Sequence, residues 1–251
     1  MMSAEIDAAI GEILTAEDSI YALDARLLEE LNPDLVITQG LCDVCAVSTN
    51  LVEEAVSGLE KKPEVLSLNP TSLREVLGDV VRVGEALDRG DATRAKVAIL
   101  TERLARVEEA VAGLTRPRVG CIEWLDPPFS AGHWVPEMVR LAGGEELFAG
   151  PGERSVRLDW KEVFEADPDV LVLMPCGFEV GRAAREAYFL PELPGWLDLS
   201  AVRTGRVWVV DANSFFSRPA PRLVEGVEIL ARILHPETFL GAANRRNAAR
   251  L

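Results

Sequence analysis

Hydrophobic and polar residues follow one order twice along the chain: a short amphipathic segment, a Pro-Asp pair and a continuous apolar run. The first copy spans residues 27–37 and the second residues 163–173. Proline cannot continue a helix and favours extended geometry in the residue before it, so each copy predicts a helix that ends before Pro33 or Pro168. The apolar run that follows is typical of a parallel strand covered on both faces. This order also arises by coincidence in α/β proteins, but two copies so far apart favour two α/β lobes.

The same periodicities predict the other elements. We expect helices over residues 4–15, 22–31, 134–142, from Asp159 to Pro168 and from Pro221 to His235. We expect strands over residues 34–38, 64–68, 118–124, 170–173 and 207–210. Residues 71–114 are almost wholly helical, with an N-cap at Thr71-Ser72 and a division at Gly90-Asp91, where Asp91 caps a second helix. Apolar residues recur in that helix at three- and four-residue steps, so one face packs against the lobes.

These elements predict an α/β fold of two Rossmann-like lobes joined by a long helix. The carboxyl-terminal half alternates strands and helices completely, whereas the amino-terminal half supplies only two strands, so its lobe is expected to be incomplete. The expected divisions are a partial lobe over residues 1–70, a helical connector over 71–116, a second lobe over 117–240 and a tail over 241–251.

Charge and composition exclude several classes of partner. The 251 residues carry a formal net charge of −15, which disfavours binding to nucleic acid or to an anionic membrane. No apolar stretch reaches the roughly 20 residues of a membrane span, so no membrane insertion is expected. The first residues lack the basic region and apolar core of an export signal. We therefore expect a cytoplasmic protein as written, and a periplasmic or extracellular one if translation starts upstream.

Three cysteines follow predicted strands and are candidates for metal binding or thiol chemistry. Cys42 and Cys45 form a C-x-x-C motif after the first strand, and Cys176 follows the second copy of the repeat. A structural zinc site usually needs four ligands with a second close pair, which this sequence lacks, so packing is the alternative. Cys121 lies inside an apolar run and is expected to be a small core residue.

Aromatic residues gather where predicted strands end, the edge at which open parallel sheets bind ligands. Six rings could line one wall: Trp124, Phe129, Trp134, Phe178, Phe215 and Phe216. Such a wall suits a bulky apolar ligand, because buried apolar area gives affinity without charged clamps. Packing at the lobe edges is the alternative for each ring.

Polar residues in the same loop offer further chemistry. His133 could supply an axial nitrogen to cobalt or iron, or it could cap the helix that follows. Glu123 and Asp126 could bond ligand amides, or serve only as solvated or capping groups. The chain has no phosphate-binding G-x-x-x-x-G-K, no strand-linked G-x-G-x-x-G and no G-x-S-x-G, and only two histidines, so it is not expected to be an enzyme.

Three stretches, in this order and spacing, carry a resemblance to a known family: residues 32–37, 127–132 with 143–148, and 213–222. Over roughly residues 22–235 the chain resembles the helical-backbone (class III) ABC-transporter substrate-binding proteins, and most closely their cobalamin-binding branch. The resemblance implies a cleft that binds cobalamin or a related corrinoid as its ligand, with no other cofactor required. It also implies the substrate-binding role in an ABC-type uptake system, or a cytosolic relative of one.

Other ligands and functions are also compatible with the sequence. The same superfamily handles haem and ferric siderophores, and a metal- or corrinoid-handling protein that uses Cys42 and Cys45, or a ligand-free interaction module, is also compatible. The ligand-binding candidates are Trp124, Phe129, Ser130, Gly132, His133, Trp134, Gly177, Phe178, Phe215, Phe216 and Arg218.

The sequence departs from the family pattern in two respects. Members usually begin with an export signal and a strand ending in a Ser-Pro or Pro-Ser turn, and neither is present in this sequence. Members that serve a permease carry an acidic docking residue on each lobe, whereas the matching position of the second lobe is Ser217. An ABC permease is therefore an uncertain partner.

Overall fold

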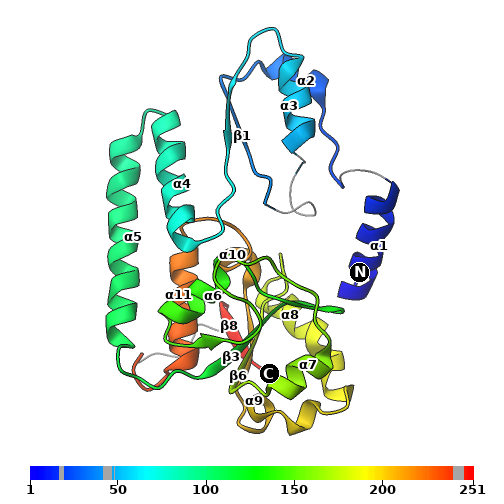
Figure 1. The fold of residues 1–251 in the computed structure, drawn as a ribbon, viewed down its shortest axis with the longest axis vertical. Coiled ribbons are helices and arrows are strands. Elements are labelled where there is room, and N and C mark those ends of the chain that lie inside the picture. The colour runs from blue at the N-terminus through cyan, green and yellow to red at the C-terminus, as the bar shows by residue number, and fades with distance from the viewer. Residues whose placement is uncertain (17–19, 42–46, 48, 240–245) are drawn as a thin grey trace.

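The computed structural model describes residues 1–16, 20–41, 47, 49–239 and 246–251. A small lobe lies above a larger one in Figure 1, and a pair of long helices, at the left, runs along the side of both. The amino-terminal elements are α1 (Ser3–Ala16), α2 (Ala25–Leu31), β1 (Leu35–Thr38), α3 (Thr49–Ser57) and β2 (Glu64–Ser67). The strands β1 and β2 pair in parallel, so the predicted strands of the first lobe are confirmed.

The first helix, α1, contacts the larger lobe. The backbone N–H and the hydroxyl of Ser3 both donate to Oε2 of Glu186, at 3.0 and 2.7 Å, and both residues are buried. The expected boundaries place α1 with the small lobe, whereas its amino end is anchored across the molecule, as Figure 1 shows.

The repeated helix, Pro-Asp and strand is present in both places, as α2 followed by β1 and as α7 (Trp160–Ala166) followed by β6 (Val170–Leu173). The expectation of extended geometry before each proline is wrong. Asn32 has φ 42° and Asp167 has φ 43°, and both cap their helices in the left-handed region. Asn and Asp tolerate this region, and each cap N–H bonds carbonyls of the last helical turn that would otherwise lack donors.

Two helices, α4 (Leu73–Ala86) and α5 (Gly90–Ala110), form the long helical connector, and the predicted division at Gly90-Asp91 is confirmed. Ser72 caps α4 as predicted, because its side chain accepts from the N–H of Glu75. Asp91 is not the cap of α5, because that helix begins at Gly90 and has no side-chain cap. A two-pronged ion pair between Arg103 and Glu228, with both N···O distances 2.9 Å, fastens α5 to α11 (Leu223–Leu234).

The larger lobe is a six-stranded mixed sheet with helices on both faces. Besides β6, its strands are β3 (Arg118–Leu125), β4 (Pro128–Ser130), β5 (Glu145–Glu146), β7 (Val207–Val210) and β8 (Ala248–Arg250). The order is β4-β3-β6-β7-β8, with β5 also paired to β3. Its remaining helical elements are α6 (Val135–Leu141), α8 (Val180–Glu186), η1 (Ala187–Glu192), η2 (Trp196–Asp198), α9 (Ser200–Arg203) and α10 (Ala212–Phe215).

The chain end differs from the expected tail. Residues 248–250 form β8, which pairs antiparallel with β7 and buries Ala248. Two alanines and an arginine give too weak an alternation to predict a strand, and β8 is defined by the edge of β7 that it covers.

Both faces of the larger sheet are buried, as the continuous apolar run of β6 predicts. Val170 and Val172 pack on the face covered by α6 and α11, and Leu171 and Leu173 pack on the face covered by α7 and α8. The two-lobed α/β prediction is therefore confirmed, with the core concentrated in the larger lobe.

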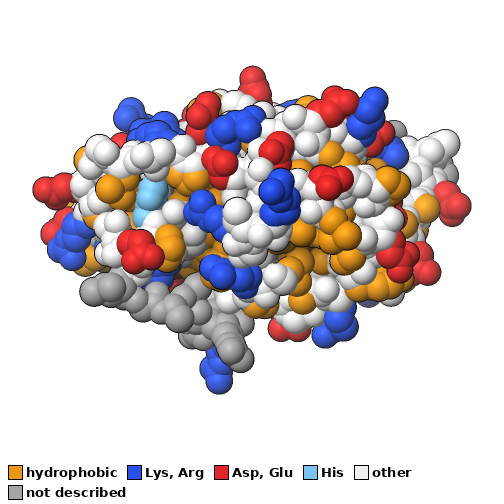
Figure 2. Space-filling view, turned by 90° about the horizontal axis from the view of Figure 1, so that it is seen from below, with side chains coloured by type: hydrophobic (Ala, Val, Ile, Leu, Met, Phe, Trp, Pro, Cys, Tyr) orange, Lys and Arg blue, Asp and Glu red, His pale blue; other side chains and the backbone are white. Residues whose placement is uncertain are grey.

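The surface of the larger lobe shows mixed charge. Figure 2 views this side, where lysines and arginines are scattered among acidic side chains without forming a continuous basic area. None of the helices in the described part of the chain is long and apolar enough to cross a membrane.

Candidate functional site

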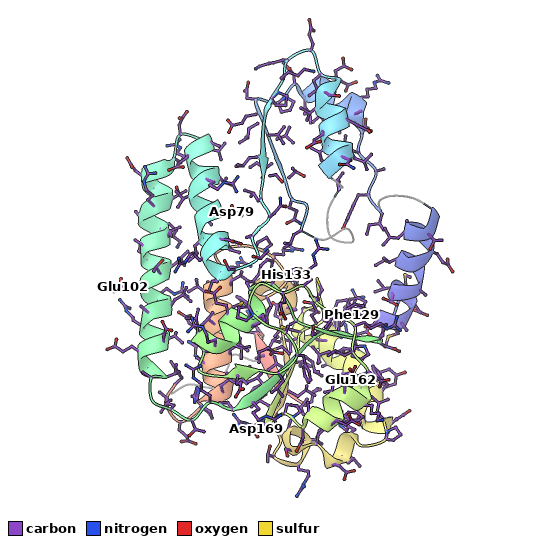
Figure 3. The ribbon with its side chains drawn as sticks, in the orientation of Figure 1. Asp79, Glu102, Phe129, His133, Glu162 and Asp169 are labelled. Carbon is purple, nitrogen blue, oxygen red and sulfur yellow. The ribbon has the colours of Figure 1, made fainter. Side chains whose placement is uncertain are left out.

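A cavity of about 400 Å³ opens where the two lobes meet. The amino-terminal part contributes Leu14 of α1 and the segment that follows β1, including Gln39 and Leu41. The larger lobe contributes residues within β3 and β4 and residues that follow β4 and β6, near the strand ends where the sequence predicts a ligand site. Figure 3 shows His133 at the end of the larger lobe that faces the small one.

The loop after β4 is held against residues 152–156. Ser130 donates its N–H to the carbonyl of Val156 at 2.9 Å, and its hydroxyl accepts from the N–H of Val156 at 3.0 Å. A Cβ on Gly132 would lie 2.4 Å from the backbone nitrogen of Ser155, so this position requires glycine. Ser130 is buried and therefore anchors the loop, whereas Gly132 lines the cavity.

His133 lies in the wall of the cavity with a left-handed backbone, φ 55°. Its N–H donates to the carbonyl of Glu153 at 2.6 Å, and its carbonyl accepts from Gly152 at 3.0 Å, so the neighbouring segment holds this uncommon conformation. The side chain does not cap α6, whose N-cap is Trp134 without a side-chain bond. Burial, and then the positive charge of Arg154, lower the pKa of His133 below its ordinary value, so the ring is neutral at pH 7.

Three of the six candidate rings line the cavity: Phe129, Trp134 and Phe216. Trp134 and Phe216 are almost fully buried, at 4% and 2% exposure, and the indole Nε1 donates to the carbonyl of Phe216 at 2.7 Å. Met174, at the end of β6, adds a thioether to the same lining. The wall is therefore mainly apolar, with its aromatic groups held by packing and by a hydrogen bond.

The other rings pack elsewhere. Phe178 is 3% exposed and belongs to the core on the α7 and α8 face, where Trp124 meets it edge-on with ring centroids 5.5 Å apart. Phe215 is buried in the core under α11. These three do not line the cavity. Gly177, with φ 76°, turns the chain between the end of β6 and Phe178, which directs that ring to the far face.

Some of the polar candidate residues also line the cavity, and others lie outside it. Gly177 and Arg218 lie outside the lining, although the N–H of Gly177 donates to the hydroxyl of Ser217 at 3.3 Å, and Ser217 does line it. Glu123 lines the cavity, whereas Asp126 is exposed and outside it.

The cysteines show one exposed thiol at the cavity. Cys176 lines it, Cys121 is fully buried, and Cys42 and Cys45 lie outside the described residues. Burial raises the pKa of the Cys121 thiol, and the neighbouring Glu146 carboxylate adds to that effect. Within the described ranges, no group of three or more His, Cys, Asp or Glu side chains could hold a metal ion.

Arg154 and Ser155 line the cavity without having been predicted from the sequence, whereas Gln39 and Leu41 belong to the segment after the first strand, where a ligand site is expected. Arg154 and Ser155 come from a segment with no regular periodicity, and hydrogen bonds to the loop after β4 bring that segment to the cavity. No local pattern indicates such a long-range pairing. The Gly150-Pro151-Gly152 turn before it is the one sequence feature that marks a loop there.

The chain matches a known family over most of its length. The family model described as periplasmic binding protein covers residues 27–214. An uncharacterized ABC transporter substrate-binding lipoprotein of Bacillus subtilis (strain 168) is 47% identical over 45 residues, 18% of this chain and 14% of that protein. A vitamin B12-binding protein of Vibrio cholerae serotype O1 is 29% identical over 98 residues, 39% of this chain and 32% of that protein. The matches thus span a third or less of these curated relatives.

The fold also resembles solved structures. A periplasmic heme-binding protein from Pseudomonas aeruginosa superposes with a TM-score of 0.70 at 20% sequence identity, over 95% of this chain and 85% of that one. At this identity the similarity establishes the shared two-lobed fold.

Proposed function

The chain belongs to the periplasmic binding protein family, and on this premise we propose that it binds a small-molecule ligand as the substrate-binding component of an ABC-type uptake system. The observation that carries the proposal is the cavity between the lobes, with Phe129, Trp134 and Phe216 in its lining. Concave, mostly apolar sites with a few polar groups are typical of ligand binding. The family assignment also makes the protein a binder and not an enzyme.

A corrinoid is the ligand that we propose first. The cavity of about 400 Å³ is near the lower end of the range for small-molecule sites, so a corrinoid would insert one face and leave the rest in the cleft. Buried rings stabilise such a ligand by roughly 25 cal/mol per Å² of apolar area removed from water. The similarity to a vitamin B12-binding protein over 98 residues supports this choice.

Haem is the second candidate, and one observation favours it. A solved structure that shares the fold is that of a periplasmic heme-binding protein. Docking to a permease would use residues other than Ser217, because Ser217 lies in the cavity wall.

Titration of the purified chain with cyanocobalamin and with haemin tests the function. We expect cyanocobalamin to change the absorbance and to raise Tm, because a ligand that binds only the folded state stabilises it. Replacement of Phe129 by Ala should weaken binding. Phe164→Ala, which trims a half-buried ring on α7 outside the cavity, is the matched control and should leave affinity unchanged. If neither ligand changes the spectrum or Tm, the tetrapyrrole-like ligand is excluded.

A further inference from the structure

Arg154 is the only lysine or arginine among the described residues that line the cavity. Its side chain forms no ion pair with the described part of the chain, although acidic residues outnumber basic ones by 41 to 26. The adjacent acid is engaged elsewhere, because Oε2 of Glu153 accepts from the N–H of Gly150 at 2.7 Å. A positive charge at the cavity is therefore left for another partner.

The backbone on both sides of Arg154 is fixed. The carbonyl of Glu153 accepts from the N–H of His133 at 2.6 Å, and Val156 exchanges two hydrogen bonds with Ser130. The guanidinium thus extends from an anchored segment, so binding a ligand group would not require ordering of the backbone.

Arg154 and His133 lie in the same part of the cavity wall. The backbone N–H of His133 donates to the carbonyl of Glu153, the neighbour of Arg154, and the positive charge of Arg154 contributes to the lowered pKa of His133. Both residues line the cavity, so the guanidinium charge and the imidazole lie in one part of its wall.

The tautomer of His133 follows from its surroundings. Nδ1 is buried and has no hydrogen-bond partner in the described residues, so a proton there would be a buried donor without an acceptor. The neutral ring is more stable with its proton on Nε2, which can then donate to a ligand. A histidine that binds a metal normally donates its other ring N–H to an acceptor, and Nδ1 has none, so this geometry favours donation over axial ligation.

We propose that Arg154, together with Nε2–H of His133, forms a subsite for an anionic oxygen group, a phosphodiester or a carboxylate, on the ligand of the cavity. The proposal rests on the function proposed above and adds the chemical class of one ligand group. Guanidinium matches such oxygens in geometry and charge.

Pairs of ligands that differ in the anionic group provide the test. Cyanocobalamin carries a phosphodiester that dicyanocobinamide lacks, and haemin carries carboxylates that its dimethyl ester lacks. Calorimetric titrations would compare the wild type, Arg154→Gln and a control, Arg157→Gln, which makes the same change at an exposed arginine of the same segment outside the cavity. Arg154→Gln should weaken the anionic member of the bound pair about tenfold or more and leave the neutral member unchanged. Arg157→Gln should change neither.

Equal losses for both members of a pair, or no loss for either, would overturn the subsite while leaving the binding function standing. If the wild type binds none of the four ligands, the proposed tetrapyrrole-like ligand is excluded, and inorganic phosphate decides the subsite separately. The chain has two histidines, so proton NMR can follow the ring resonances of His133 with His235 as internal reference. Phosphate should raise the pKa of His133 in the wild type and not in Arg154→Gln, and an unchanged pKa in both would reject the subsite.

Discussion

The indole Nε1 of Trp134 donates a 2.7 Å hydrogen bond to the backbone carbonyl of Phe216, 82 residues later in the chain. Trp134 is the N-cap residue of α6 and Phe216 the C-cap residue of α10, so the bond joins two short helices at the cavity wall. Both residues are buried, and the bond therefore sets the orientation of the indole and satisfies a carbonyl that water does not reach.

Replacing Trp134 by Phe should destabilise the protein and weaken ligand binding. The ring remains but the N–H is lost, and a buried carbonyl without a donor costs about 1–3 kcal/mol. Urea unfolding would measure the change in free energy, and cyanocobalamin titration the change in affinity. Trp160→Phe is the control, because the Trp160 indole donates to the carbonyl of Leu125 on the opposite face of the sheet. Equal affinity losses in both variants would argue against a local role for Trp134.

Replacing Gly132 by Ala should disturb the cavity rim. The added methyl group would lie 2.4 Å from the backbone nitrogen of Ser155 and 2.7 Å from the carbonyl carbon of Arg154, so backbone has to move. We expect a loss of about 1–3 kcal/mol in the free energy of unfolding, together with weaker binding of anionic ligands. Thermal and urea unfolding would measure the former. Gly181→Ala is the control, because its nearest neighbours lie 3.7 Å away and it occupies helix α8, where alanine is tolerated or favoured.

Local patterns predicted the helices and the central strands well, and they failed where distant contacts decide. The repeat correctly predicts two helices that end at Pro-Asp, but the left-handed caps at Asn32 and Asp167 depend on hydrogen bonds to the last helical turn, which outweigh the preference imposed by proline. Phe178 follows β6 as a cavity residue should, yet the turn at Gly177 sends its ring to the opposite core. Arg154 reaches the cavity through backbone bonds to the loop after β4, which no local pattern encodes.

Glu146 should make stability fall as pH rises. Burial raises the pKa of Glu146 from 4.5 to about 8, and Oε2 has no partner in the part of the chain described. Between these two values the folded state holds a proton that the unfolded state has lost, so the free energy of unfolding decreases with pH, by up to about 1.4 kcal/mol per unit. His133 acts in the opposite sense below its ordinary pKa of 6.5, because the unfolded state takes up the proton first as pH falls.

Glu146→Gln should remove the alkaline decline while keeping an acceptor for the N–H of Phe148, which bonds Oε1 at 3.1 Å. Urea unfolding across the neutral and weakly alkaline range would compare the two proteins. If the variant keeps the slope of the wild type, Glu146 is not the group responsible.

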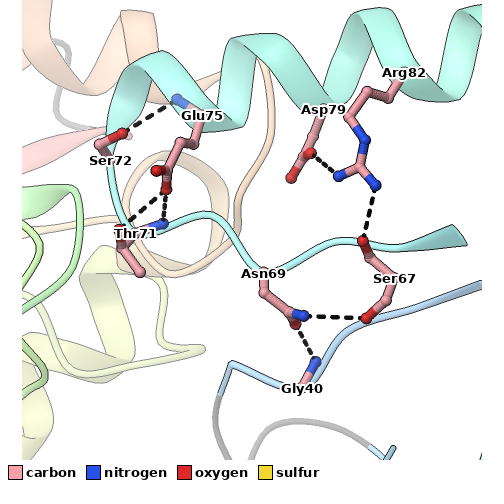
Figure 4. A network of polar contacts seen from close by, with 8 residues as sticks. All are labelled: Gly40, Ser67, Asn69, Thr71, Ser72, Glu75, Asp79 and Arg82. Atoms are coloured by element: carbon pink, nitrogen blue, oxygen red, sulfur yellow. Dashed lines mark hydrogen bonds and ion pairs between the residues drawn. The ribbon is translucent and has the colours of Figure 1, made fainter.

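Asn69 is the centre of a hydrogen-bond network that links the segment after β1 to the end of β2. Figure 4 shows that its Oδ1 accepts from the N–H of Gly40 at 2.5 Å, while its Nδ2 donates to the hydroxyl of Ser67 at 3.1 Å. Arg82 of α4 donates to the carbonyl of Ser67 at 3.2 Å and to Asp79 at 2.7 Å, which ties the same strand end to the connector. Gly40 lies between Gln39 and Leu41 of the cavity lining, so this network holds one wall of the cavity in place.

Replacing Asn69 by Ala should therefore affect binding more than stability. The side chain is exposed, so the loss in the free energy of unfolding should stay near 1 kcal/mol or below. The amide of Gly40 loses its acceptor and should exchange with solvent faster, and cyanocobalamin affinity should fall because Gln39 and Leu41 must be ordered on binding. Amide hydrogen exchange and titration would measure the two effects. Asn50→Ala, on an exposed position of α3 with no side-chain hydrogen bond in the described structure, should change neither, and a similar effect there would show that the small lobe responds to any such substitution.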